Sequence, residues 1–326
     1  MKKTTLATLS LLLFCYMFLA SGSILMAQSP KIQGELKKWH TVSLQFDGPQ
    51  CSETDFRPNP FLDYRLEVTF TNGKKSVKMP GFFAADGNAA ETSAISGNKW
   101  QVNFVPDEAG SWNYRVSFRE GKNISISDNA NAGNELSPNG ISGTLQIAET
   151  NQTAPGFLAK GRIISNGTRY LRFAGTGEYF LKNGSDSPEN FLAYIDFDQT
   201  YRFGDKAIIR EGEANPKESC HKYEAHVKDW KTGDPTWQGG KGKGIIGALN
   251  YLASQGVNSQ YMLTMNIQGD GKDVWPYADH DERYRFDCSK LAQWDIVFTH
   301  MDRLGMMMHF VLQETENECL LDGGHT

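Results

Sequence analysis

The chain has 326 residues, of which 39 % are hydrophobic, 12 % aromatic and 22 % charged. This composition excludes a disordered, a collagen-like and a small disulfide-stapled chain, because enough apolar side chains are present to form a core. The 33 basic and 38 acidic residues give a net charge of −5. Nucleic-acid binding needs clustered basic side chains, so no nucleic-acid partner is expected and a neutral ligand fits better. The length predicts two domains at about 150 residues each.

The first 27 residues have the pattern of a secretory signal peptide. Lys2 and Lys3 precede an apolar stretch at residues 11–20, and small residues follow, ending at Ala27. An uncleaved membrane anchor is the alternative, but Ser21 and Ser23 interrupt the stretch short of the ~20 apolar residues that a membrane span needs. We therefore expect an exported protein, secreted, periplasmic or on the cell surface, with no membrane association after cleavage.

Residues 33–150 are expected to form an all-β sandwich. Short runs in which apolar and polar residues alternate recur between turn residues, for example at 64–70, 100–105 and 112–118. This period of two is typical of half-buried antiparallel strands. Three tryptophans in this region, Trp39, Trp100 and Trp112, could form a sugar-stacking platform, but strand aromatics more often lie in the core. A linker is expected near residues 150–155.

The pattern changes to an α/β one in residues 155–326. A helix over residues 245–253 is expected to end at Gly256, and a strand over residues 257–265 follows. Asp287 or Ser289 can cap a second helix that ends at Gly305, before a strand over residues 306–312. This order predicts a parallel sheet, with residues 170–175 as an earlier strand.

Polar and aromatic residues follow each expected strand of this sheet. In parallel α/β folds the loops at the carboxyl ends of the strands carry the chemistry. Carboxylates and amides bind hydroxyl groups, and aromatic faces stack on sugar rings, so the sequence favours a carbohydrate site. The expected substrate-binding residues are Glu178, Asn266, Asp270, Trp275, Tyr277, Gln313, Glu314 and Glu316.

Two motif groups resemble known bacterial families. Residues 59–64, 80–87, 97–100 and 106–114 are similar to DUF5060, an immunoglobulin-like module of uncharacterised function. Residues 187–198, 226–230, 269–276 and 309–317 resemble the opening of an apiosidase-like glycoside hydrolase barrel of the DUF4038 type. The resemblance implies an immunoglobulin-like sandwich followed by a (β/α)8 TIM-type barrel that is incomplete, because such a barrel needs ~250 residues.

The resemblance implies a glycoside hydrolase that acts on polysaccharide. In related barrels the catalytic carboxylates leave strand four or later strands, so the catalytic residues are expected beyond Thr326 and the chain alone is expected to be inactive. Glu314 and Glu316 are low-ranking catalytic candidates, better interpreted as substrate-binding residues. A non-catalytic carbohydrate-binding or cell-surface adhesion protein is the alternative.

No metal or cofactor is expected. His221 and His226 lie five residues apart in a polar segment without a third ligand nearby, and a solvated loop is the better interpretation. The cysteines outside the signal peptide have no metal-type spacing; three disulfide pairings are open to them, but buried free thiols are expected. These cysteines are Cys51, Cys220, Cys288 and Cys319.

Overall fold

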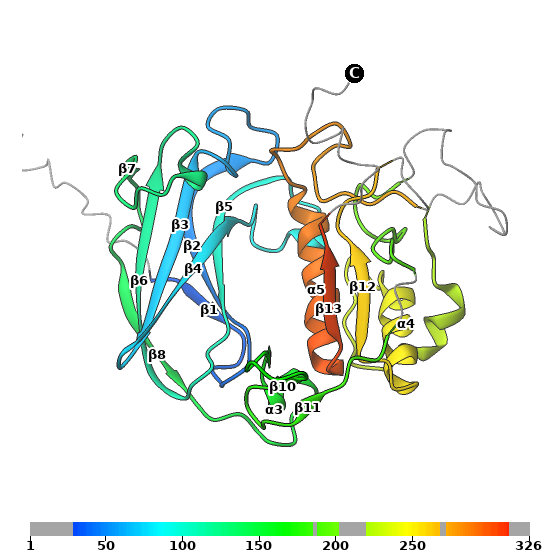
Figure 1. Cartoon of the computed structure of the whole chain (residues 1–326). Helices are drawn as coiled ribbons and strands as arrows, with labels where there is room; N and C mark the ends of the chain where they lie inside the picture. Colours follow the sequence, from blue (N-terminus) through cyan, green and yellow to red (C-terminus); the bar gives the residue numbers. More distant parts are fainter. Residues whose placement is uncertain (1–28, 185–187, 202–219, 268–271, 313–326) are drawn as a thin grey trace, which may run out of the picture.

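The computed structural model describes residues 29–184, 188–201, 220–267 and 272–312. The N-terminal part is mostly β: antiparallel strands form one curled sheet in the order β1-β2-β5-β4-β3-β6-β7, and β8 pairs with β6 (Figure 1). Two short helical turns, α2 (Ala89–Thr92) and η1 (Ile124–Ile126), lie in its loops. The strands are β1 (Lys31–Gln33), β2 (Val42–Ser52), β3 (Tyr64–Asn72), β4 (Lys75–Phe83), β5 (Ser96–Phe104), β6 (Gly110–Glu120), β7 (Asn134–Glu135) and β8 (Ser142–Ile147).

Strand β4 makes the sheet continuous. Its residues up to Pro80 pair with β3, whereas Gly81 and the two residues after it pair with β5. Gly81 lies against Leu66, and a Cβ at this position would come within 2.5 Å of the Leu66 side chain, so the bend has room only for glycine. A strand that changes partners in this way turns one sheet back on itself. The expected β domain is therefore present as a curled antiparallel sheet, and its assignment as an immunoglobulin-like sandwich stays a prediction.

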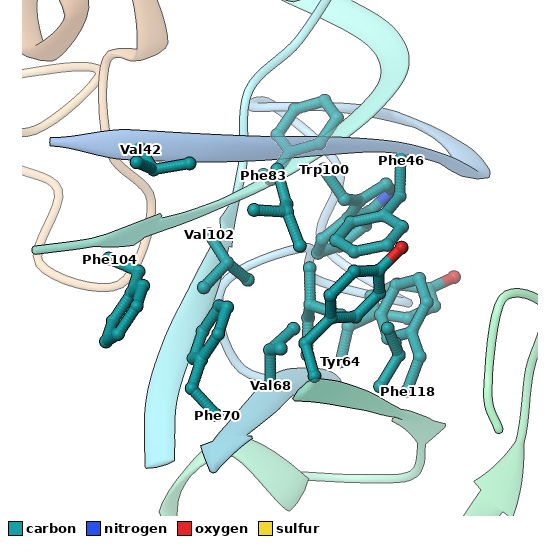
Figure 2. Close-up of a cluster of buried hydrophobic side chains, with 14 of the residues drawn as sticks. Val42, Phe46, Tyr64, Val68, Phe70, Phe83, Trp100, Val102, Phe104 and Phe118 are labelled. Atoms are coloured by element: carbon teal, nitrogen blue, oxygen red, sulfur yellow. The ribbon is translucent and has the colours of Figure 1, made fainter. Parts of the chain in front are cut away.

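The core of this part lies inside the curl, where aromatic rings from opposite strands meet (Figure 2). Phe70 of β3 stacks on Phe104 of β5 with 4.0 Å between ring centroids, and Trp100 lies 4.9 Å from Phe118 of β6. Strand β3 alternates buried and half-buried residues along most of its length, as its sequence predicts. The three tryptophans Trp39, Trp100 and Trp112 are buried, which confirms that they belong to the core.

Residues 157–180 form a small separate unit of α3 (Phe157–Lys160), β9 (Ile163–Ile164), β10 (Leu171–Phe173) and β11 (Tyr179–Phe180). Strand β10 pairs antiparallel with both β9 and β11. The prediction that residues 170–175 begin the parallel sheet was therefore wrong. Gly177, in the left-handed region with a φ of 73°, allows a turn that folds Tyr179 back onto Arg172, so β10 pairs locally.

The parallel α/β unit is present. It contains η2 (Glu224–Asp229), α4 (Lys243–Ser254), β12 (Ser259–Leu263), α5 (Cys288–Leu304) and β13 (Met307–Val311). Strands β12 and β13 pair in parallel, as predicted, and α5 connects them. Asp287 caps α5 by accepting a hydrogen bond from the Lys290 amide, and Gly256 and Gly305 follow their helices with positive φ, which confirms these predicted ends.

The curled sheet packs against the start of α5 (Figure 1). The amide of Cys288 donates to the Glu53 carboxylate at 2.9 Å, and Gln238 donates through its side chain to the Ala90 carbonyl and the Ser93 hydroxyl. Cys51 and Cys288 are buried free thiols, as expected, and Cys220 is also buried; Cys319 lies outside the described residues. Among the described helices, none is long and apolar enough to cross a membrane.

Candidate functional site

The carboxyl ends of β12 and β13 lie side by side. The register pairs Leu263 with Val311, and the next residue, Thr264, donates its amide to the Val311 carbonyl at 3.0 Å. The Thr264 hydroxyl donates to the Leu312 carbonyl at 3.2 Å. The segments that leave the two strands therefore start together, as the sequence predicted for a shared rim.

Asn266 closes the loop that follows β12. Its amide and carbonyl both bond with the backbone of Val274, at 2.8 and 2.7 Å, and its side chain donates to the Lys272 carbonyl at 3.4 Å. Asn266 is fully buried, and Asp273 beside this bridge is 2 % exposed. Asn266 therefore fixes the shape of the loop through contacts in its buried interior. The substrate contact predicted for Asn266 stays a prediction.

Trp275 lies beneath the rim rather than on it. The side chain is 2 % exposed and packs with Met265, Ile267 and Tyr277. The Nζ atom of Lys290 in α5 lies 4.9 Å from the centre of the Trp275 ring and donates to the Trp275 carbonyl at 3.2 Å. Stacking on a sugar needs an open ring face, so the sugar-stacking role expected for Trp275 does not fit this burial.

Tyr277 is the more accessible aromatic residue of the pair. It forms an antiparallel bridge with Phe286, and the two rings lie 5.3 Å apart. The Arg283 guanidinium lies 5.4 Å from the Tyr277 ring, and burial raises the pKa of the Tyr277 hydroxyl. Tyr277 is half-buried, so part of this residue remains accessible to a ligand.

A buried charged cluster that the sequence analysis missed supports this segment. Lys290 and Asp287 are each 1 % exposed, and Lys290 Nζ lies 3.9 Å from Asp287 Oδ2. Burial lowers the pKa of Lys290 to about 8 and raises the pKa of Asp287. A lysine in the first turn of a helix opposes the helix dipole, and this is the sequence signal that could have drawn attention to it. The cluster holds residues 275–287 onto α5.

Glu178 does not join this site. It follows β10 in the small antiparallel unit, where its carboxylate pairs with Lys160 at 2.8 Å on the surface. Figure 1 places β10 and β11 at the end of the molecule opposite to the arrowheads of β12 and β13. The edge of β12 that does not pair with β13 instead contacts Asn183 and Glu189 through backbone hydrogen bonds of 2.8 and 2.7 Å. The prediction that Glu178 shares the rim was wrong because β10 is not part of the parallel sheet.

The other predicted rim residues cannot be placed. They lie outside the described residues, and their roles stay predictions: Asp270, Gln313, Glu314 and Glu316.

The histidines are engaged in local contacts. His221 Nε2 lies 2.7 Å from Asn190 Oδ1, and burial lowers its pKa to about 4, whereas His226 pairs with Asp229 at 3.0 Å. Within the described ranges, the group that comes nearest to a cation site is formed by the consecutive residues 279–281. The two ring nitrogens of His280 lie 2.7 and 3.1 Å from the carboxylates of Asp279 and Asp281.

Comparison with known proteins adds two findings. Residues 35–119 match DUF5060, a domain of unknown function. The chain is also similar to the crystal structure described as "a putative glycoside hydrolase" from Bacteroides vulgatus, with 16 % identity and a TM-score of 0.49. The similarity covers 88 % of this chain and 42 % of that one, so this chain spans less than half the length of that protein. No curated protein matches the chain.

Proposed function

We propose that this chain belongs to an exported glycoside-hydrolase-like protein that acts on polysaccharide. In this proposal residues 33–150 form an immunoglobulin-like module of the DUF5060 type, and residues 155–326 belong to a (β/α)8 barrel of the DUF4038, apiosidase-like type. Residues 1–27 are its signal peptide.

One observation carries the proposal: α5 connects the parallel strands β12 and β13, whose carboxyl ends open onto one rim. This is the repeating unit of a (β/α)8 barrel, in which the active site lies at the carboxyl ends of the strands. Hydrolytic activity is inferred from this unit by analogy with barrel enzymes of the same fold. A barrel has eight such strands, so the proposal includes strands beyond the two described.

In this proposal the substrate is bound by rim residues that are accessible or that lie outside the described ranges. Tyr277 is partly accessible, and Asp270, Gln313, Glu314 and Glu316 follow the two strands in sequence. Asn266 and Trp275 support these residues from below, because both are buried.

A non-catalytic carbohydrate-binding or adhesion protein remains the second candidate. In the described part of the rim, residues 264–267, 272–277 and 312, the carboxylate present is that of Asp273, and it is buried. Hydrolysis of a glycosidic bond needs two carboxyl groups about the substrate. The described rim thus offers contacts to a sugar but no accessible pair of carboxyl groups.

Release of reducing sugar decides between these functions. The protein translated from the complete reading frame is incubated with plant and algal polysaccharides, and release from at least one is expected. Glu314→Gln and Glu316→Gln in the same protein are expected to raise KM about tenfold and to change kcat little, as for substrate-binding residues. A loss of kcat beyond about 1000-fold would instead make that residue catalytic. Binding without any release would leave the adhesion or binding function.

Export is tested separately. The mature protein is expected to begin at Gln28, and mass spectrometry of the N-terminal peptide from the exported fraction measures this. An N-terminal peptide that still contains residues 1–27 would contradict the signal peptide.

A further inference from the structure

A groove of about 830 Å³ opens between the curled sheet and the segment before α5. We name it the loop groove. The residues that line it include Phe56, Arg57, Glu120, Lys122, Ile126 and Tyr284. These residues come from the β2–β3 loop, from the end of β6 and the loop after it, and from residues 282–285. Figure 1 places the β2–β3 loop and the segment before α5 at the end of the molecule toward which β12 and β13 point.

Hydrogen bonds join the two sides of the loop groove. The Asn59 side chain donates to the Tyr284 carbonyl at 3.2 Å, and Arg285 Nη1 donates to the Thr54 carbonyl at 2.7 Å. Arg285 is also paired with Glu282 beside it. The groove therefore exists without a ligand, and binding needs little rearrangement of its walls.

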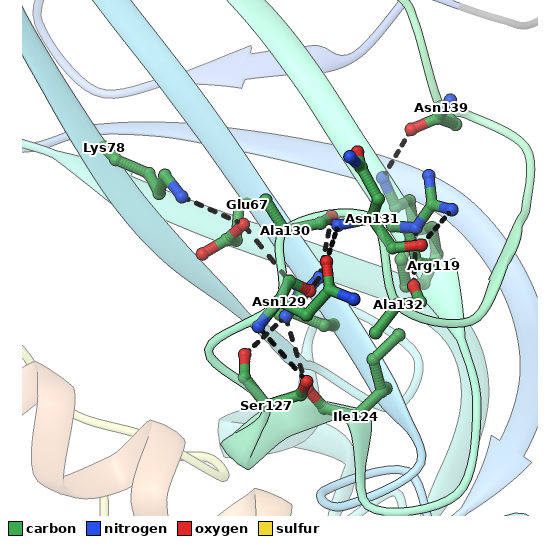
Figure 3. A network of polar contacts seen from close by, with 12 residues as sticks. Glu67, Lys78, Arg119, Ile124, Ser127, Asn129, Ala130, Asn131, Ala132 and Asn139 are labelled. Carbon is green, nitrogen blue, oxygen red and sulfur yellow. Dashed lines mark hydrogen bonds and ion pairs between the residues drawn. The ribbon is translucent and has the colours of Figure 1, made fainter.

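Two arginines hold the loop that follows β6 (Figure 3). Arg65 donates to the carbonyls of Ser127, Asn129 and Ala130 at 2.7 to 3.0 Å. Arg119 donates to the carbonyls of Asn131, Ala132 and Gly133 at 2.7 to 2.9 Å. Each guanidinium binds several carbonyls in a fixed geometry, so the loop that carries Lys122 and Ile126 is rigid although it has almost no regular secondary structure.

Large apolar side chains are exposed along the loop groove. Phe56, Tyr284 and Ile126 are 72 %, 64 % and 75 % exposed. Exposed aromatic rings beside a preformed concave surface mark a binding site more often than scattered apolar residues do. Flat rings of this kind stack on the C–H faces of sugars, and the Tyr284 hydroxyl can exchange hydrogen bonds with a ligand.

The polar groups of the loop groove favour a neutral ligand. Glu120, Arg57 and Lys122 take part in no ion pair with any described residue. An acidic ligand would meet the Glu120 carboxylate, and a basic one would meet Arg57 and Lys122. A ligand rich in hydroxyl groups can bond to all three, since hydroxyls both donate and accept.

We propose that the loop groove binds a neutral segment of a polysaccharide, apart from the rim of β12 and β13. The ligand class rests on the proposed carbohydrate function, whereas the location rests on the groove itself. A chain held in the loop groove would present its neighbouring sugars toward the end of the molecule where the rim lies.

Affinity electrophoresis tests this proposal. The protein is run through native gels that contain xyloglucan, galactomannan or laminarin, all neutral, and through a gel that contains polygalacturonate. Retardation by at least one neutral polysaccharide is expected, with none by polygalacturonate. The double variant with Phe56→Ala and Tyr284→Ala is expected to bind at least tenfold more weakly. Phe82→Ala is the matched control, because Phe82 is 45 % exposed and lies outside the groove.

The outcomes separate the loop groove from the proposed function. Thermal unfolding of the double variant is measured first, and a melting temperature equal to that of the control shows that both are folded. Unchanged retardation of the double variant would overturn the groove proposal and place sugar binding elsewhere. Reducing-sugar release without any retardation would also overturn it, while the hydrolase proposal would stand. Capture by polygalacturonate alone would contradict the neutral ligand.

Discussion

The Glu53 carboxyl group is buried where the curled sheet contacts the start of α5. It is 5 % exposed and accepts a hydrogen bond from the Cys288 amide. Burial raises its pKa from 4.5 to about 7, and the nearby Asp287 carboxylate adds to this shift. The folded protein therefore binds this proton more tightly than the unfolded chain does. The resulting stabilisation is complete below about pH 4.5 and is lost as the pH rises through 7.

Glu53→Gln is expected to remove this pH dependence. A pKa difference of this size corresponds to about 3 kcal/mol, so at pH 8 the variant should be more stable than the unaltered protein by about 1–3 kcal/mol. At pH 4.5 the two should be nearly equal. Urea unfolding at both pH values measures the difference, with Glu149→Gln, at a side chain 73 % exposed, as the control. An equal effect at both pH values would show that Glu53 does not titrate as described.

Trp275→Ala is expected to destabilise the protein by about 3–5 kcal/mol, the usual range for a large aromatic residue removed from a core. The ring is enclosed by Lys290 of α5, by the residues after β12 and by the Tyr201 ring, and its removal leaves Lys290 without its ring contact. Tyr284→Ala, at a residue 64 % exposed, should change the unfolding free energy by less than about 1 kcal/mol. Chemical denaturation measures both. If the Trp275→Ala protein were as stable as the Tyr284→Ala protein, Trp275 would not be part of the core.

Elements with strong local signals were predictable from the sequence, and those that depend on distant partners were not. Asp287 caps the start of α5 and Gly305 ends the helix, as predicted. Both residues act through the adjacent backbone, so the local sequence is enough to identify them. Residues 170–175 have the composition of a strand, but composition does not reveal which strand they pair with. The burial of Trp275 depends on contacts with distant side chains such as Lys290, whose Nζ lies 4.9 Å from the centre of the ring. No spacing in the sequence encodes these contacts.

Arg119→Ala is expected to lower the local stability of the loop between β6 and β7. The guanidinium bonds to three carbonyls of this loop and to Glu135, so its loss leaves several acceptors without partners. Amides in residues 129–135 should exchange with solvent at least about tenfold faster, which corresponds to a loss of about 1.4 kcal/mol in local stability. Arg115→Ala, at an exposed position on the same strand, is the control. Unchanged exchange would mean that the backbone alone holds the loop.

At the scale of the whole molecule, the linker expected near residues 150–155 is held on both sides. The Thr150 hydroxyl donates to the Leu158 carbonyl at 2.6 Å, and Gly156 lies against the last turn of α5. Glu53 joins the same two parts at the start of α5, and Gln238, in the segment before α4, joins them through Ala90. Because the sheet and the α/β unit are joined at both ends of α5, they are expected to unfold in one cooperative transition.

Gly156→Ala tests this coupling. Gly156 has a φ of +57°, and a Cβ there would press on the Asp302 carbonyl and the Gly305 amide, both backbone groups. Gly167→Ala is the matched control: its φ is +79°, but a Cβ at that position meets nothing within 4 Å. At Gly167 the alanine carries the strain of a positive φ, about 1–2 kcal/mol. At Gly156 the ψ of −131° lies outside the left-handed helical region and adds further backbone strain. Gly156→Ala also adds a clash of about 1–3 kcal/mol with the last turn of α5. Scanning calorimetry should therefore show a melting temperature for Gly156→Ala several degrees below that of Gly167→Ala, with a broadened or divided transition. Equal melting temperatures and a single sharp transition in both variants would mean that the linker contact does not couple the two parts.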